Sequence, residues 1–206
     1  MSNQKMVITV GRECGSGGHE ISERLEQHYG IKLYDRGIID VMAEQLNEDP
    51  ETLTRIDEKL TRRFSIRKGG FAALRNDPLN KLSKADLLYL REEATIRKLA
   101  EEESFILVGR AGNAILDGNP NVIRFFIFAS EEFKIPRVME YYHLNTEKEA
   151  KKKMEQVDKD RQNFYHYYSG LSWGSSEGYD FLLDSSVLGI DETVNLITSI
   201  VDRKFS

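Results

Sequence analysis

Short apolar runs alternate along the chain with segments in which apolar residues recur at helical spacing. Five of the runs are typical of strands and cover residues 5–10, 31–34, 105–108, 122–128 and 179–183. The run 122–128 (VIRFFIF) is apolar on both faces except at Arg124, as expected of a parallel strand that helices cover on both sides. Because strands and helices alternate, the pattern predicts an α/β fold with a mostly parallel, five-stranded sheet.

The segments between these runs predict helices. The first carries Ile21, Leu25 and Tyr29 at helical spacing and is closed by Gly30. Further helices are expected over residues 37 to about 60 (with Pro50 opening a second helix), 85–102, 131–143 (with a bend at Pro136), 146 to about 168, and 191–205.

Two segments depart from this regular pattern. Residues 64–84 show no periodicity, so we expect a loop of a length usually reserved for functional or disordered segments. The helix at 146–168 is highly charged and has little apolar stripe, which indicates a helix that is solvated or bridges other parts. Lys151–Lys153 within it is expected to be a solvated face.

Composition narrows the function classes. The 206 residues are 40% hydrophobic and 31% charged, which is enough for one domain with a sizeable core. The net charge of −5 argues against a nucleic-acid binder, which needs a basic face. No apolar run approaches the roughly 20 residues of a membrane span, and MSNQKMVITV lacks the pattern of a secretory signal. One cysteine, Cys14, makes no internal disulfide, so the cytoplasm is the expected compartment.

A glycine-rich segment, GRECGSGG, joins the first predicted strand to the first helix. Gly11, Gly15, Gly17 and Gly18 allow positive φ and a close approach of a bulky anion to the backbone. Together with the helix N-terminus, such a loop makes a site suited to phosphate. The alternative is a tight turn that holds no ligand.

The loop is not a regular Walker A sequence, because Gly18, or Gly17 in a second register, stands where the lysine belongs. Arg12 is the nearest substitute cation, and Ser16 is the hydroxyl inside the loop that could meet a magnesium ion. His19 stands at the usual Ser/Thr place in the first register, where it could contact a phosphate. The alternative is a solvated histidine at a helix end. A lowered thiol pKa is one expectation for Cys14 in this loop.

Polar residues follow the other predicted strands where each one ends. Ligands of parallel α/β sheets bind at the carboxyl ends of the strands, so we expect these segments to form one site with the glycine loop. They are Asp35, Gly109–Arg110, Phe128–Ser130 and Asp184–Ser186.

With these motifs in place, the chain resembles the cytidylate kinase-like proteins, a divergent branch of the nucleoside monophosphate kinases in the P-loop class. The resemblance runs from about residue 7 to 201 and rests on several motifs in order: GRECGSGGHEI, YDR, VGRAGNAIL, RFFIFASEEFKIPRV, DKDRQNFYHYYSGLSWG and YDFLLDSSVLGID. It implies a three-layer α/β/α P-loop domain with a core (1–35, 104–132, 171–206), a helical acceptor-binding insert (36–103) and a lid (133–170).

The resemblance also implies roles for single residues. Asp35 lies where these kinases hold a catalytic carboxylate near magnesium, while Arg137 and Arg161 match catalytic lid arginines that close over the phosphates. Arg110 and Asp184 match residues on the acceptor side, and Arg36 falls in the same pocket. At Arg36, Ala111 and Phe128 the chain departs from the cytidylate kinase pattern, which leaves the phosphorylated acceptor open.

Each of these residues also has a simpler interpretation. Asp35 or Asp184 could cap a helix, and an arginine of so charged a chain is often part of a surface ion pair. Aromatic residues form two clusters, at Tyr141–Tyr142 and at 164–168, and the second continues to Trp173. Two roles are open for them: stacking on a nucleotide base, or packing the lid against the core.

The first hypothesis is therefore an ATP- and Mg²⁺-dependent kinase that phosphorylates a nucleoside monophosphate or another small phosphorylated acceptor. The alternatives are a nucleotide-binding protein without turnover, which the missing lysine favours, and a kinase of a non-nucleotide metabolite. The expected partners are small-molecule nucleotides, and neither nucleic acid nor a membrane is expected as a partner. Whether the chain forms a homodimer stays open.

Overall fold

A computed structural model describes residues 5–35, 37–46, 49, 51, 53 and 83–206 of the chain. Its sheet contains β1 (Val7–Arg12), β2 (Lys32–Tyr34), β3 (Phe105–Val108), β4 (Val122–Phe128) and β5 (Phe181–Asp184). The five strands are all parallel and are ordered β2-β3-β1-β4-β5, with β1 in the centre. The prediction of a parallel five-stranded α/β fold is confirmed.

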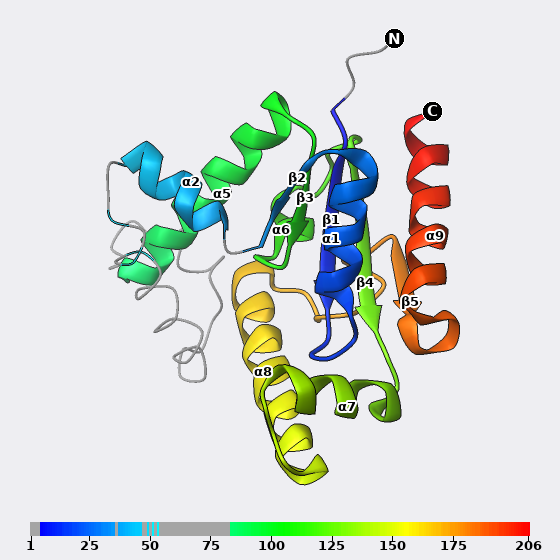
Figure 1. Ribbon diagram of the computed structural model, residues 1–206. Coiled ribbons are helices and arrows are strands. Elements are labelled where there is room, and N and C mark those ends of the chain that lie inside the picture. Colours follow the sequence, from blue (N-terminus) through cyan, green and yellow to red (C-terminus); the bar gives the residue numbers. More distant parts are fainter. Residues whose placement is uncertain (1–4, 36, 47–48, 50, 52, 54–82) are drawn as a thin grey trace.

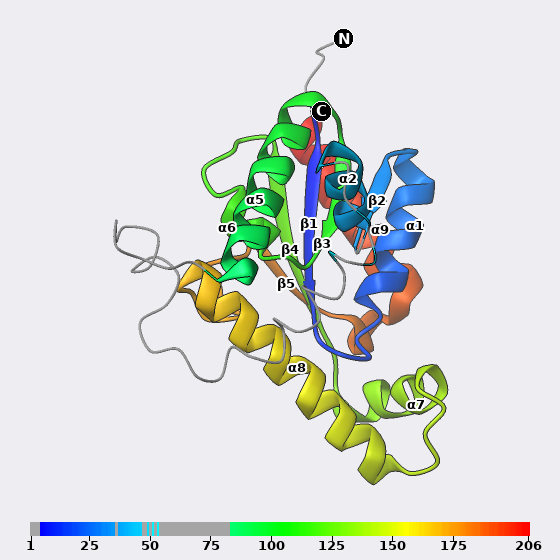
Figure 2. The same cartoon turned by 90° about the vertical axis from the view of Figure 1, so that its left-hand side faces the viewer.

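Helices cover both faces of the sheet (Figures 1 and 2). On one face α1 (Gly18–Tyr29) and α9 (Ser185–Phe205) pack against Ile8 and Val10 of β1. On the other face α2 (Gly37–Leu46), α5 (Lys84–Glu102) and the short α6 (Gly112–Ile115) pack over Val7 and Leu107. Alternate residues of β1 therefore serve opposite layers, as the two-residue period of a strand requires.

The two remaining helices extend below the carboxyl edge of the sheet (Figure 2). Helix α7 (Glu131–Tyr141) and the long α8 (Glu147–Ser169) pack on each other through Val138, Ala150 and Met154, and Cys14 of the glycine segment joins this cluster. At its far end α8 buries Tyr167 and Tyr168 against α5, with the Tyr168 ring stacked on that of Tyr89 at 3.6 Å. The charged helix thus bridges two parts of the molecule, which is one of the two roles that its sequence indicates.

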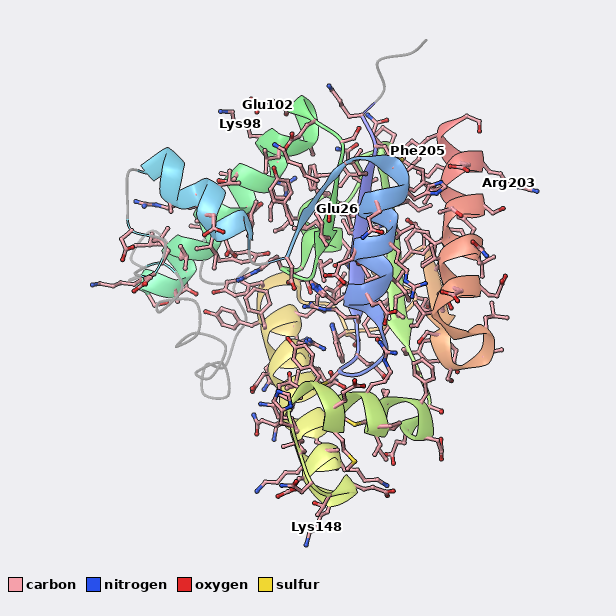
Figure 3. All side chains as sticks on the ribbon, in the orientation of Figure 1. Glu26, Lys98, Glu102, Lys148, Arg203 and Phe205 are labelled. Carbon is pink, nitrogen blue, oxygen red and sulfur yellow. The ribbon has the colours of Figure 1, made fainter. Side chains whose placement is uncertain are left out.

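Most charged side chains stand outward, as Lys98, Lys148 and Arg203 do in Figure 3. No helix in the described part of the chain is both long and apolar enough to cross a membrane.

Several boundaries differ from the sequence prediction for local reasons. Strand β1 continues to Arg12 because Gly11 and Arg12 still pair with β4. Strand β5 begins at Phe181, where its pairing with β4 starts, and the Tyr179 ring before it packs on Phe126. Helix α9 begins at Ser185 and is kinked at Gly189, whose φ of 77° is not helical. Helix α6 was not predicted, because its four residues are too few to show a period.

Some sequence predictions fall on residues outside the described ones. These are Arg36, the second helix opened by Pro50, and the loop at 64–84 apart from its last two residues. Ser83 caps α5 with its side chain, and Lys84 is already helical, so helix α5 begins one residue before the predicted start at residue 85.

Candidate active site

Two neighbouring cavities open at the carboxyl edge of the sheet, where the strand-end residues were expected to meet. A cavity of about 890 Å³ lies over the glycine loop, and we call it the loop cavity. A second, of about 410 Å³, lies between β1, β3 and α8, and we call it the aromatic cavity. Four residues line both of them: Arg12, Asp35, Tyr142 and Arg161. The two cavities thus adjoin at a cluster of charged groups.

The glycine loop takes its shape from residues that tolerate no side chain. Gly15 and Gly17 have φ values of 83° and 80°, and a Cβ at Gly17 would lie 2.3 Å from Ile190. A Cβ at Gly18 would lie 2.5 Å from the Cβ of Arg12. Gly17 is the N-cap of α1 and supplies no side-chain acceptor. The first amide groups of α1 are therefore available to an anion.

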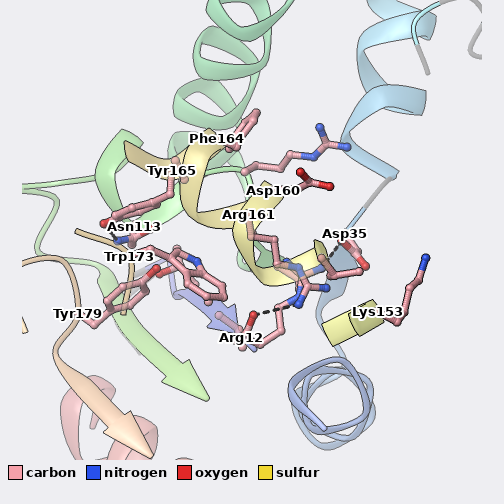
Figure 4. Close-up of a pocket in the computed structure, with 18 of the residues that line it drawn as sticks. Arg12, Asp35, Asn113, Lys153, Asp160, Arg161, Phe164, Tyr165, Trp173 and Tyr179 are labelled. Atoms are coloured by element: carbon pink, nitrogen blue, oxygen red, sulfur yellow. Dashed lines mark hydrogen bonds and ion pairs between the residues drawn. The ribbon is translucent and has the colours of Figure 1, made fainter. Parts of the chain in front are cut away.

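Arg12 is the central cation of this cluster. Its Nη2 lies 3.4 Å from Oδ1 of Asp35 (Figure 4). Burial, and then the neighbouring charge of Arg161, lower the pKa of Arg12 to about 10, while Asp35 opposes that shift. A buried guanidinium that faces a second one is costly unless an anion compensates it. The cluster therefore favours an anionic ligand.

Asp35 lies between two basic side chains. Arg12 contacts Oδ1, and Nδ1 of His19 lies 3.3 Å from Oδ2. The carboxylate lines both cavities and its side chain keeps 30% of its exposure, so it can reach a ligand. His19 also approaches Glu23 at 3.4 Å and lines the loop cavity.

Helix α8 binds the glycine loop through two side chains. Asp158 accepts a hydrogen bond of 2.7 Å from the main-chain N–H of Cys14. Arg161 donates to the main-chain carbonyl of Arg12 at 3.1 Å and lies 3.4 Å from Asp158. The predicted lid helix thus contacts the backbone on both sides of Glu13.

Cys14 differs from its expected chemistry. Burial raises the pKa of its thiol above the ordinary value, and Arg161 opposes that shift only in part. Its side chain packs with Ile135 and Val138, so the expectation of a lowered thiol pKa is wrong.

Arg137 and Arg110 also reach the cavities, each with an acidic partner. Arg137 lines the loop cavity and pairs with Glu20 in the first turn of α1. Arg110 lines the aromatic cavity, and its Nη1 lies 3.2 Å from Oε1 of the buried Glu92. Arg110 also has a φ of 56°, a left-handed conformation that is uncommon outside glycine.

Some of the expected site residues line neither cavity: Ser16, Phe128–Ser130 and Asp184–Ser186. The hydroxyl of Ser16 is fully buried and donates to the carbonyl of Glu13 at 2.9 Å, which turns it away from the site. Asp184 caps α9, because it accepts from the N–H and the hydroxyl of Ser186. The contacts of Asp184 support its interpretation as a helix cap. The hydrogen bond of Ser16 indicates a structural role within the loop.

The aromatic cavity contains three polar residues that the sequence analysis did not single out: Thr9, Asn113 and Asp160. Lys153 and the aromatic residues Phe164, Tyr165, Trp173 and Tyr179 also line it, and the rings of Tyr165, Trp173 and Tyr179 lie on one side in Figure 4. The ammonium of Lys153 lies 4.5 Å from the centre of the Tyr142 ring, so this lysine is not part of a merely solvated face. The aromatic residues of the cluster at 164–168 differ in their surroundings, because Tyr165 lines the cavity whereas Tyr168 packs in the core.

Known proteins share sequence and fold with this chain. The profile of the Cytidylate kinase-like family matches residues 7–187. A cytidylate kinase from Methanopyrus kandleri is 26% identical over 98% of this chain and 96% of its own length. The crystal structure of an uncharacterized protein from Eubacterium ventriosum superposes with a TM-score of 0.72 at 30% identity, over 96% of this chain and 99% of that one.

More distant solved structures share the fold alone. A shikimate kinase from Bacteroides thetaiotaomicron has a TM-score of 0.51 at 12% identity, covering 96% of this chain and 98% of its own. A gluconokinase from Sinorhizobium meliloti has a TM-score of 0.51 at 14% identity, covering 98% and 94%. The fold is accordingly that of the P-loop kinases. With its glycine loop, its strand-end arginines and a profile match over most of its length, the chain belongs to the cytidylate kinase-like family.

Proposed function

We propose that the protein transfers the γ-phosphoryl group of ATP to a small phosphorylated acceptor, and that a nucleoside monophosphate is the acceptor. The observation that carries the proposal is the junction of the two cavities at Arg12, Asp35 and Arg161. A donor in the loop cavity and an acceptor in the aromatic cavity would have their phosphates adjacent at this junction. Phosphoryl transfer depends on such positioning and on neutralised charge more than on covalent chemistry by the protein.

The donor phosphates fit the glycine loop and the guanidinium groups around it. The free amides of α1 face an anion site, and Arg12 supplies a buried positive charge next to it. Arg161 and Arg137 add charge from α8 and α7. Arginine suits this task because its planar group contacts two phosphate oxygens at once and stays charged. We propose that these arginines replace the absent Walker lysine.

The residues present also fit Mg²⁺ held largely by substrate. Asp35 offers a hard carboxylate oxygen in both cavities, and no group of three metal-binding side chains occurs among the described residues. Magnesium in kinases commonly takes one or two protein carboxylates and several phosphate oxygens, and when bound it neutralises developing charge. Asp35 would hold the ion, whereas Ser16 is fully buried and lines neither cavity.

Arg110 and the aromatic side chains are proposed to bind the acceptor. Arg110 is held by Glu92 at the turn after β3, where it can contact the acceptor phosphate. Trp173 and Tyr165 supply flat surfaces suited to a base or sugar. The name of the Methanopyrus relative makes CMP the first acceptor to test. The proposal includes the core, insert and lid boundaries that the resemblance implies. It also includes a cytoplasmic location.

The test is ADP release from Mg-ATP against a panel of nucleoside monophosphates and non-nucleotide phosphorylated metabolites. We expect one nucleoside monophosphate to stimulate release, and Asp35→Asn to lose that turnover. Asp40→Asn is the matched control, since Asp40 is exposed on α2 and lines neither cavity. ATP binding without stimulation by any acceptor would overturn the kinase and favour the nucleotide-binding protein without turnover, which the missing lysine supports. Stimulation only by a non-nucleotide metabolite would overturn the nucleotide acceptor.

A further inference from the structure

We propose that Thr9 determines acceptor specificity by forming a hydrogen bond to the end of the acceptor farthest from its phosphate. The inference rests on the proposed function and names a contact within the acceptor cavity. Thr9 lies in the middle of β1, pairs with Leu107 on one side and Arg124 on the other, and lines the aromatic cavity. Only 2% of it is exposed.

The Thr9 hydroxyl has no hydrogen-bond partner in the described part of the chain. Buried hydroxyl groups are nearly always bonded, because a buried group without a partner has lost its hydrogen bonds to water. Two other buried hydroxyls show the usual arrangement: Thr193 donates to the carbonyl of Gly189 at 2.6 Å, and Ser185 donates to the carbonyl of Ser16 at 2.6 Å. The Thr9 hydroxyl departs from this arrangement and belongs to a residue that lines the aromatic cavity.

Asn113 provides a second polar group on the same cavity. Its amide nitrogen donates to the Tyr165 hydroxyl at 2.7 Å and to the carbonyl of Gly178 at 2.8 Å. A carbonyl can only accept, so this contact fixes the orientation of the amide. No described residue donates to Asn113 Oδ1. The wall thus offers one hydroxyl that can donate or accept, and one oxygen that can only accept.

Toward the carboxyl ends of the strands, cationic side chains line the same cavity. Arg12 follows Thr9 by three residues on the same strand, a separation of roughly 10 Å at the rise of a parallel strand. Arg110 and Arg161 line the cavity as well. A ligand that satisfies both ends carries a phosphate at the arginines and an N–H or O–H group at the Thr9 end. A nucleoside monophosphate with a free sugar hydroxyl or base amino group has this chemistry.

Thr9→Val removes the hydroxyl and keeps the shape of the side chain, while Thr9→Ser keeps the hydroxyl. We expect Thr9→Val to weaken the binding of CMP about tenfold in a calorimetric titration without donor, and Thr9→Ser to retain it. The affinity for ATP should be unchanged in both variants. A CMP affinity of Thr9→Val equal to that of the wild type would overturn the assignment, and so would an equal loss for CMP and ATP.

The thermal stability of the free protein gives a readout that is independent of turnover. Since the Thr9 hydroxyl has no partner to lose, free Thr9→Val should unfold at the wild-type temperature or above it. Thr193→Val is the matched control, because Thr193 is 1% exposed and its hydroxyl is bonded, so that variant should unfold earlier. If the wild type binds no nucleoside monophosphate, the proposed acceptor is wrong. The stability comparison then tests by itself whether the Thr9 hydroxyl lacks a partner in the free protein. A Thr9→Val variant that unfolds as early as Thr193→Val would overturn the inference.

Discussion

Arg161 donates a hydrogen bond of 3.1 Å to the main-chain carbonyl of Arg12, although 149 positions separate the two residues in the sequence. The contact fixes helix α8 against the glycine loop and holds a second guanidinium beside a buried one. It also explains why the pKa of Arg12 is lowered to about 10, since burial and Arg161 both disfavour its charged form. Asp35 and Asp158 offset only part of the unfavourable charge at Arg12, and a phosphate bound between the two cations would offset more of it.

Gly109 keeps space for Arg12. A Cβ at Gly109 would lie 2.5 Å from Arg12 Nη1, at a φ of 77°. We expect Gly109→Ala to displace the guanidinium and lower kcat/KM for ATP about tenfold or more. Gly118→Ala is the control, because Gly118 has a φ of 76° and a Cβ there meets nothing within 4 Å. Both variants should lose about 1–2 kcal/mol from the left-handed backbone. Equal kinetics in the two would contradict the role given to Arg12.

Arg12 itself should be needed for its charge. Arg12→Ala should reduce kcat/KM for ATP roughly 10- to 100-fold, since hydrogen bonds to charged groups contribute about 1.5–3 kcal/mol. Arg12→Lys should recover part of the loss, because an ammonium keeps the charge but not the bidentate geometry. Arg203→Ala, on the exposed end of α9, serves as the control in the same steady-state assay. Wild-type kinetics for Arg12→Ala would remove the proposed substitute for the lysine.

Asp158 makes the stability of the protein depend on pH in a defined direction. Burial raises the pKa of its carboxyl above the ordinary 3.8, despite the N–H of Cys14 and the charge of Arg161. A carboxyl with a raised pKa contributes stability below its ordinary pKa and loses that contribution as pH rises through the raised value. Asp158→Asn should therefore gain stability relative to the wild type between pH 4 and 7.

Thermal unfolding across that pH range measures the effect. Asp158→Asn keeps an oxygen that accepts from Cys14, whereas Asp158→Ala leaves the N–H without this acceptor and should be less stable than Asp158→Asn at every pH. A difference between Asp158→Asn and the wild type that stays constant with pH, or reverses, would refute this explanation.

Arg110 and Glu92 should be coupled in stability but not in binding. Arg110→Ala removes the guanidinium 3.2 Å from a carboxylate that is only 2% exposed, which we expect to cost about 3–5 kcal/mol of the free energy of unfolding. The double variant Arg110→Ala/Glu92→Ala should recover part of this loss without recovering acceptor affinity. Denaturant unfolding and acceptor titration on the same preparations measure the two effects. A double variant that binds the acceptor as the wild type does would exclude Arg110 from the acceptor site.

The sheet and most helices could be predicted from the sequence because their signals are local. Apolar runs mark β3 and β4, and Gly30 ends α1 where the periodicity of Ile21 and Leu25 stops. The strand ends also predict that Arg12, Asp35 and Arg110 face the same region, since parallel strands end at one edge.

The rest of the site depends on contacts that no local pattern encodes. Asp158 contacts the loop from a highly charged helix whose sequence leaves open whether it is solvated or bridging, and Thr9 lies in an ordinary β-branched run. Ser16 fits a loop hydroxyl by its spacing, yet its side chain closes the turn on Glu13 instead. Such positions are decided by the close packing of α7, α8 and α9 around the loop, as the contacts of Gly15 and Gly17 with Val138 and Ile190 show.

The most direct test of the account is calorimetric titration of the wild-type protein with ATP, ADP, AMP and adenosine in the presence of Mg²⁺. If main-chain amides and arginines at the loop hold the donor phosphates, affinity should be greatest for ATP and fall with each phosphate removed, and added salt should weaken it. Equal affinity for adenosine and ATP, or no binding of ATP, would contradict a phosphate site at the glycine loop.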